Sequence, residues 1–327
     1  MTRKRVLTGS RPSGSPHLGN YFGALKPAID LGKEHELFFF LADFHALNEG
    51  VDKDKMRQDS LDLSATMLAC GLDPHKDFFY AQSGVPEVNE LCWVLSCIAP
   101  LGMMHRSVAY KDAQQKGIEI NMGVFNYPIL MAADILLYDP HLVPVGQDQK
   151  QHLEMARDFA QRFNNKYGQV FRLPDPLISK EVAVVPGCDG EKMSKSKDNI
   201  VSIFASDKIW KKQIMGIKTS SEGLDEPKDP EVCTVYKLFK LLASQDDAAR
   251  MADKYRAGGY GFGHAKMELL EKVKEVFGPK RDLYHDLMAR PDELTDIVQM
   301  GSKKVREIAR EKLEQVQESL GLLGRPF

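Results

Sequence analysis

The sequence predicts an α/β fold, a Rossmann-like doubly wound parallel sheet with a smaller all-helical domain. Three observations support this prediction. Short apolar runs alternate with helical patterns over roughly the first 200 residues, which is typical of parallel strands joined by helices. Beyond that point the helical patterns are rich in Lys and Glu and contain no convincing strand. The chain also has 327 residues, more than a single core usually holds, so two domains are expected.

The composition is that of an ordinary globular protein. It is 43% hydrophobic with a formal net charge of −2, so any contact with nucleic acid must be local. Apolar runs are too short for a membrane helix, and the basic N-terminus lacks the apolar core of a signal peptide, so we expect a cytoplasmic protein. The cysteines lack C-x-x-C spacing, which predicts free thiols and no metal site; they are Cys70, Cys92, Cys97, Cys188 and Cys233.

The predicted elements of the first domain follow one another in β–α order. A strand at residues 6–8 leads into a Gly/Ser turn, and a helix begins at His17. Further strands are expected at residues 37–42, 77–81 and 142–145, and helices at residues 54–70, 85–98, 122–138 (interrupted by Pro128) and 148–167. Ligands of such sheets bind beyond the carboxyl ends of the strands, so residues 9–14, 43–45 and 146–149 should meet at one site.

The second part of the chain is predicted to be helical throughout. Its expected helices cover residues 207–215, 235–244, 246–255 and 265–276, followed by a longer tail over residues 292–323 that breaks near Gly301. We therefore divide the chain into residues 1–200, 201–288 and 289–327. The last segment is expected to pack back on the first.

Two segments carry phosphate-binding chemistry. At the helix that begins near His17, free backbone N–H groups and the helix dipole favour an anion, and His17 and Asn20 can donate to phosphate oxygens. Gly19 would let a base or ribose approach the backbone, although a capped helix with a surface histidine has the same pattern. Residues 192–196 place two lysines on a glycine-flanked loop that can close on a triphosphate and stabilise a departing pyrophosphate.

Asp134 is a carboxylate within an almost wholly apolar predicted helix, where it is costly to bury without a partner. An indole N–H can only donate, so its recognition needs an acceptor of this kind. Asp134 could also accept a hydrogen bond from a tyrosine hydroxyl. The alternative is that Asp134 forms a structural ion pair with an arginine. At the next strand end, Gly146 could lie against a nucleotide, while Asp148 could reach ribose or cap the following helix.

These segments resemble class I aminoacyl-tRNA synthetases, and nearly the whole chain resembles the bacterial-type tryptophanyl-tRNA synthetase family. Residues 192–196 match its KMSKS signature and residues 17–20 a HIGH-like element. Residues 130–138 and 148–152 are similar to strings specific to the tryptophanyl enzymes. The resemblance implies ATP-dependent activation of L-tryptophan and transfer to tRNA(Trp). Residues 1–200 would be catalytic and residues 201–288 would bind the anticodon. A tyrosyl enzyme and a non-aminoacylating, RNA-binding paralogue are the alternatives.

The resemblance also implies roles for individual residues. Catalytic groups would be Lys192, Lys195, His17 and Lys111. ATP would contact Arg11, Pro12, Ser13, Gly19, Asn20, Gly146, Gln147, Asp148, Val185, Lys192, Met193, Ser194, Lys195 and Ser196. Tryptophan would contact Asp134, Met131, Tyr127, Gln149, His45, Val143 and Val145.

The chain departs from the family pattern at Arg11, at Ala113 and at residues 188–190, which shorten the approach to the signature loop. Arg11 stands where glutamine is usual, and Ala113 stands where a second lysine is common, which leaves Lys111 or Lys116 for that phosphate contact.

The substrate complex that the resemblance implies is ATP with Mg²⁺, without a tightly bound prosthetic group. The implied assembly is a homodimer with tRNA crossing between subunits, contacted through lysines such as Lys211, Lys212 and Lys218.

Overall fold

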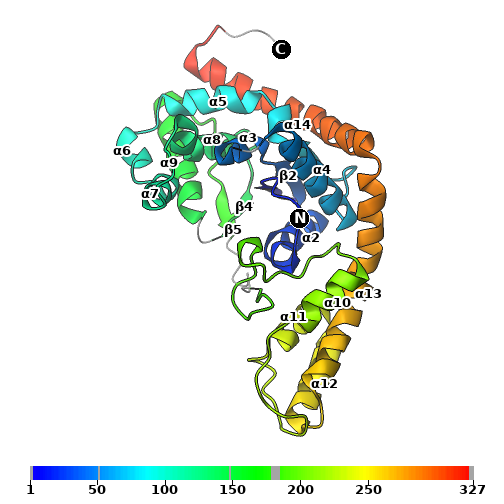
Figure 1. Ribbon diagram of the computed structural model, residues 1–327. Coiled ribbons are helices and arrows are strands. Elements are labelled where there is room, and N and C mark those ends of the chain that lie inside the picture. Colours follow the sequence, from blue (N-terminus) through cyan, green and yellow to red (C-terminus); the bar gives the residue numbers. More distant parts are fainter. Residues whose placement is uncertain (1–2, 51, 147–148, 178–184, 324–327) are drawn as a thin grey trace.

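The computed structural model describes residues 3–50, 52–146, 149–177 and 185–323, and its centre is a five-stranded parallel sheet, whose place in the fold can be seen in Figure 1. The strand order is β3-β2-β1-β4-β5. The strands are β1 (Arg5–Ser10), β2 (Glu36–Leu41), β3 (Phe78–Ala81), β4 (Leu142–Pro144) and β5 (Asp175–Leu177). The order reverses between β1 and β4, which confirms the doubly wound α/β prediction. Sequence reasoning misses β5, because three residues that include Pro176 carry no strand pattern.

Strand β2 is apolar on both faces because helices cover both faces of the sheet. Leu37 and Phe39 belong to one hydrophobic core, whereas Phe38 and Phe40 belong to the other. On the second face, Phe38 stacks on Phe78 of β3 with ring centroids 4.3 Å apart. Alternate side chains of a strand point to opposite faces, so an uninterrupted apolar run indicates a strand buried on both sides.

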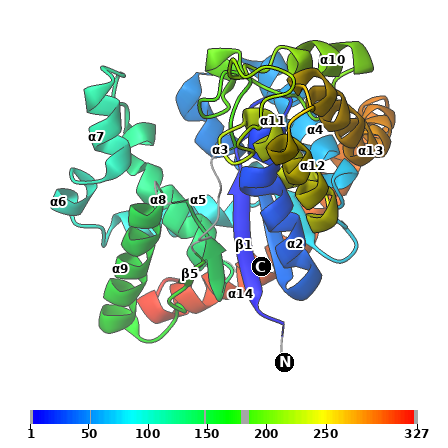
Figure 2. The same ribbon diagram turned by 90° about the horizontal axis from the view of Figure 1, so that it is seen from below.

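Figure 2 shows the two layers of helices on either side of the sheet. One core contains α2 (Lys26–Glu34), α4 (Lys53–Ala69) and helices of the second half. The other contains α5 (Glu87–Ser96), α8 (Met122–Leu136) and α9 (Lys150–Tyr167). Shorter helices are α1 (Leu18–Asn20), α3 (Asp43–Ala46), α6 (Leu101–Met104) and α7 (Val108–Gln115). None of the described helices combines the length and apolarity needed to cross a membrane.

Pro128 does not interrupt α8, contrary to the prediction. The helix continues from Met122 to Leu136 with Pro128 inside it. A proline removes one backbone donor, but the turns on both sides keep their own hydrogen bonds. The buried apolar face, which includes Ile129 and Ala133, packs into the second core and holds the helix together.

The described residues beyond 200 form helices and no strand. These helices are α10 (Asp207–Met215), α11 (Thr234–Leu242), α12 (Gln245–Ala257), α13 (Phe262–Met288) and α14 (Pro291–Leu320). α13 continues through Gly278 and Pro279 and is therefore longer than the predicted residues 265–276. The division of the chain at residues 200 and 288 stays a prediction.

α14 is unbroken at Gly301, so the predicted break is wrong. A β-carbon at Gly301 would lie 1.7 Å from the carbonyl oxygen of Phe79, so only glycine lets α14 cross β3 this closely. Next to it, the Ser302 hydroxyl accepts from the Ala81 N–H at 3.4 Å. Further along α14, Arg306 pairs with the buried Glu87 of α5 at 2.8 Å. This glycine permits close packing and does not end the helix.

Candidate active site

A cavity of about 1470 Å³ opens at the carboxyl ends of β1 and β4, where the strand order reverses. As expected, the ends of β1, β2 and β4 contribute to it through Gly9, His45 and Gly146, and Leu177 at the end of β5 also lines it. Predicted site residues that line the cavity are Arg11, His17, Gly19, Asn20, His45, Tyr127, Met131, Asp134, Val143, Val145, Gly146, Gln149, Val185, Lys192, Met193 and Ser194. The fold therefore gathers both signature segments and the predicted tryptophan pocket into one space.

Other predicted site residues are not in the cavity lining. Pro12, Ser13, Lys195 and Ser196 belong to the two phosphate-binding segments without lining the cavity. Lys111 is exposed on α7 and lies outside the cavity lining, as does Lys116, which pairs with Asp112 at 2.7 Å. Gln147 and Asp148 lie outside the described residues. The proposed phosphate role of Lys111 stays a prediction.

His17 caps α1 and is a neutral hydrogen-bond donor. Its Nδ1 accepts from the Asn20 N–H at 3.3 Å, and Asn20 Oδ1 accepts from the His17 N–H at 3.2 Å. Burial and the nearby charge of Lys195 lower the pKa of His17 to about 4, so the ring is neutral at pH 7. Because Nδ1 is an acceptor, the ring proton is on Nε2. This N–H is available to a phosphate oxygen.

Gly19 lets the signature loop pack against α1. A β-carbon at Gly19 would lie 2.8 Å from the His17 ring and 3.4 Å from Cβ of Met193. The Gly19 N–H also approaches the Met193 sulfur at 3.3 Å. The missing side chain therefore makes room for His17 and Met193. The contact predicted between Gly19 and a base or ribose stays a prediction.

The signature loop is held by a side chain that sequence reasoning missed. Asn199 is 3% exposed, accepts from the Ser194 N–H at 2.8 Å and donates to the Lys192 carbonyl at 3.1 Å. It also donates to the Asp189 carboxylate at 2.7 Å. The loop is further tied by Met193, whose N–H donates to the Val185 carbonyl at 3.0 Å. The sequence signal for Asn199 is its position three residues after the signature loop.

At the other end of the cavity, Asp134 is 3% exposed and paired on both oxygens. The Gln82 amide donates to Oδ1 at 2.9 Å and to Oδ2 at 2.8 Å, and His45 Nε2 lies 3.0 Å from Oδ2. Burial raises the pKa of Asp134, while His45 and Gln82 act to lower it. An ionised carboxylate has about four acceptor positions. Oδ1 therefore keeps an acceptor position for a donor in the cavity.

Gln82 connects this carboxylate to the end of β2. It is fully buried, and its Oε1 accepts from the Phe44 N–H at 3.1 Å and the His45 N–H at 3.4 Å. Sequence reasoning missed Gln82. Its position directly after β3 carries the same strand-end signal as residues 43–45 and 146–149.

The walls around Asp134 are aromatic and apolar. His45 and Tyr127 lie with ring centroids 4.4 Å apart, and Tyr127 lies 5.4 Å from His152. His152 Nδ1 is 3.0 Å from Oε1 of Gln149, so that amide is oriented at the cavity wall.

Met131, Val143 and Val145 supply apolar surface around the same pocket. The pocket suits a flat, mostly apolar ligand with one donor on its ring system.

The model of tRNA synthetases class I (W and Y) matches residues 2–278. The chain belongs to this family. Tryptophan--tRNA ligase of Campylobacter jejuni is 46% identical over 318 residues, covering 97% of this chain and all of the relative. That of Fusobacterium nucleatum is 46% identical over 327 residues, 99% of this chain and all of the relative.

Solved structures agree with this family assignment. The crystal structure of the Campylobacter jejuni tryptophanyl-tRNA synthetase, complexed with ADP and tryptophan, matches with a TM-score of 0.92 at 46% identity. The match covers 97% of this chain and 100% of that one. A tyrosyl-tRNA synthetase of Archaeoglobus fulgidus matches with a TM-score of 0.68 at 19% identity, which shows the shared fold alone.

Proposed function

We propose that this class I synthetase activates L-tryptophan with ATP and transfers it to tRNA(Trp). The observation that carries the proposal is the buried Asp134 acceptor in an apolar, aromatic pocket that opens into the same cavity as the signature loop. The Campylobacter and Fusobacterium relatives, both named tryptophan--tRNA ligases, support it.

In the first step, a carboxylate oxygen of tryptophan attacks the α-phosphorus of ATP, and the bond to the bridging oxygen breaks as pyrophosphate leaves. The Oδ1 atom of Asp134 would accept from the indole N–H and fix the ring. Lys192 of the signature loop and His17 at the N-cap of α1 line the cavity, and they would stabilise the negative charge that develops on the departing group. Mg²⁺ enters with ATP as part of the substrate. Positioning and charge stabilisation supply the catalysis.

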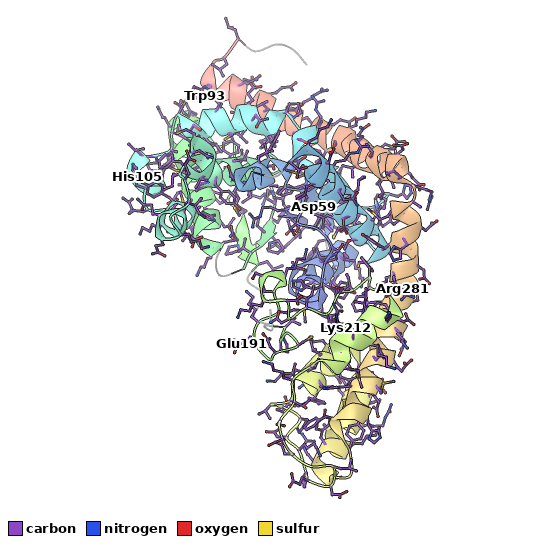
Figure 3. The ribbon with its side chains drawn as sticks, viewed as in Figure 1. Asp59, Trp93, His105, Glu191, Lys212 and Arg281 are labelled. Carbon is purple, nitrogen blue, oxygen red and sulfur yellow. The ribbon has the colours of Figure 1, made fainter. Side chains whose placement is uncertain are left out.

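In the second step, a hydroxyl of the terminal ribose of tRNA attacks the carbonyl carbon of tryptophanyl-adenylate, and AMP leaves. Its proton passes to the leaving phosphate or to solvent. The helical second half has exposed lysines on α10 and just after it that could contact RNA. Among them are Lys211, Lys212 (labelled in Figure 3) and Lys218. A cytoplasmic location is part of this proposal.

Amino-acid-dependent exchange of labelled pyrophosphate into ATP tests the activation step. We expect exchange with tryptophan and at least about 10⁴-fold less with tyrosine, because a mismatched ligand leaves buried polar groups unpaired. Exchange with tyrosine alone would make this a tyrosyl enzyme. Nucleotide binding without charging of tRNA(Trp) would support the non-aminoacylating alternative.

We also propose that the active form is a homodimer. The outer surface of α5 to α8 carries large apolar side chains that are exposed in the single chain; they are Trp93, Leu101, Val108, Ile118 and Met122. Trp93 is 71% exposed on the outer side of α5, where Figure 3 labels it. Exposed apolar patches of this kind mark interaction surfaces. A second copy of the chain is the occupant that the family resemblance implies.

A further inference from the structure

Lys195 of the signature loop is held away from the cavity. Lys192 and Ser194 of the same loop line the cavity, as does Lys197 just after it, whereas Lys195 does not. Its ammonium donates to the carbonyl oxygen of Ser13 at 2.7 Å. The lysine expected to stabilise the pyrophosphate is therefore engaged with the turn that follows β1.

Two buried carboxylates of α4 face the same turn. Asp59 is 7% and Asp62 is 5% exposed. A β-carbon built at Gly14 would lie 3.4 Å from Asp59 Oδ1 and 3.5 Å from Lys195 Nζ, so the carboxylate and the ammonium both lie beside Gly14. The other oxygen of Asp59 pairs with Lys55 at 2.6 Å. Burial lowers the pKa of Lys195, and the charges of Asp62 and Asp59 oppose that lowering.

Asp62 connects this arrangement to the helical half. Its Oδ2 accepts from the Ser15 hydroxyl at 2.7 Å, and its Oδ1 accepts from the Tyr284 hydroxyl of α13 at 3.0 Å. Tyr284 stacks on Phe204 with ring centroids 4.4 Å apart. Asp62 thus joins α4, the phosphate-binding turn and α13 beside the loop lysine. Figure 3 labels Asp59 one turn earlier on the same helix.

We propose that Asp59 and Asp62 are positioning residues whose charges hold Lys195 at the Ser13 turn, away from the triphosphate, so that ATP binding must draw the lysine away from these charges. The inference rests on the proposed ATP-dependent function. The acidic pair and the triphosphate compete for one ammonium group, and the conformation with Lys195 in the cavity is only part of the population. Apparent ATP affinity is reduced by that fraction. Removing the carboxylate charges should therefore tighten ATP binding.

Calorimetric titration with Mg·ATP tests this in Asp59→Asn, Asp62→Asn and the double variant of the full chain. We expect the Kd for ATP to fall about fivefold in the double variant, with a parallel fall in KM for ATP in pyrophosphate exchange. Asp54→Asn removes a charge from the exposed start of the same helix and should leave the Kd unchanged. A solely structural role for the two carboxylates predicts an equal or weaker affinity, which would overturn the inference.

Combining the Asp59 and Asp62 substitutions with Lys195→Ala tests whether the acidic pair acts through the lysine. If the acidic pair acts through Lys195, its removal has no effect on ATP affinity once the lysine is gone, so the double-mutant cycle shows coupling. Additive effects would overturn the inference. If Asp62→Asn melts prematurely through loss of the Tyr284 contact, Asp59→Asn alone carries the test. An ATP Kd that shifts as expected in a protein without tryptophan-dependent exchange would contradict the proposed function and leave this inference standing.

Discussion

At the scale of single residues, Asp134 keeps an acceptor position for a ligand because the groups that donate to it lie at the ends of strands, where they are held in place. Gln82 follows β3 and reaches both carboxylate oxygens, while its own carbonyl oxygen is held by the N–H groups of Phe44 and His45. Every polar atom of the Gln82 amide therefore has a partner, although the side chain is fully buried. Such a network fixes the direction in which Asp134 faces the cavity.

Gln82→Met is expected to weaken tryptophan recognition. The thioether has a similar length but cannot donate to Asp134, so the carboxylate loses two hydrogen bonds and its orientation. Losing hydrogen bonds to a charged group costs about 1.5–3 kcal/mol each, so KM for tryptophan should rise at least about tenfold. Steady-state pyrophosphate exchange at varied tryptophan measures this, with Gln114→Met on the exposed surface as the control. An unchanged KM would contradict the positioning role.

Gln82→Met should also change the pH dependence of KM for tryptophan. Burial raises the pKa of Asp134, whereas the Gln82 amide acts to lower it. Removing Gln82 therefore raises this pKa further, and the carboxylate gains a proton at a higher pH. The acidic limb of 1/KM for tryptophan should move to higher pH in Gln82→Met. A profile from pH 4.5 to 8 checks the direction, and a shift toward lower pH would contradict it.

Lys195→Ala is expected to reduce tryptophan-dependent pyrophosphate exchange. Removing one charge contact to a developing anion raises the barrier by about 3–4 kcal/mol, or roughly 100- to 1000-fold in rate. Exchange rates at saturating ATP measure this. Lys211→Ala, on the exposed surface of α10, should leave exchange unchanged because no tRNA takes part. Wild-type turnover in Lys195→Ala would remove the loop lysine from the mechanism.

Sequence patterns predicted the cavity residues that belong to contiguous motifs, because a motif carries its chemistry in its own residue types. The segments around His17, Asp134 and Lys192 are of this kind, and all three residues line the cavity. Gln82 and Asn199 could not be assigned in the same way. Their roles come from hydrogen bonds to distant backbone and side-chain atoms, which only the folded chain brings together.

At the scale of elements, sequence prediction was accurate where periodicity and burial agree. The strand at β2 and helix α10 were predicted almost to the residue, because both have clear patterns and clear ends. The errors at Pro128 and Gly301 have one physical cause. Residues that break isolated helices are tolerated when tertiary packing supplies the stability, and Gly301 is required by the approach of α14 to Phe79.

Gly301→Ala is therefore expected to destabilise the protein although alanine is the better helix former. The new methyl group would collide with the Phe79 carbonyl, so α14 must move off β3, and we expect a loss of about 3 kcal/mol or more in the free energy of unfolding. Gly263→Ala in α13 is the matched control, because nothing lies within 4 Å of the added methyl group. It should gain up to about 1 kcal/mol. Urea unfolding distinguishes the two, and equal effects would contradict the packing argument.

At the scale of the whole molecule, the cavity and the exposed apolar patch lie on connected helices. α8 carries Asp134 in its buried half and begins at Met122, which is 67% exposed. α5 exposes Trp93 and anchors α14 through Glu87. The helices that would meet a second copy are therefore the same ones that support the proposed tryptophan pocket.

Trp93→Glu is expected to separate the proposed dimer. A charge in the apolar centre of an interface has to be desolvated without a partner, which costs several kcal/mol, so the dimer Kd should rise by at least about 100-fold. Sedimentation equilibrium across a range of protein concentrations measures this. Because the substituted side chain is 71% exposed in one chain, the monomer should keep its melting temperature within a few degrees.

Ile209→Glu, at an exposed apolar residue of α10 outside the patch, is the matched control and should leave association unchanged. A wild-type protein that sediments as a monomer would contradict the dimer, and equal loss of association in both variants would contradict the assignment of its surface.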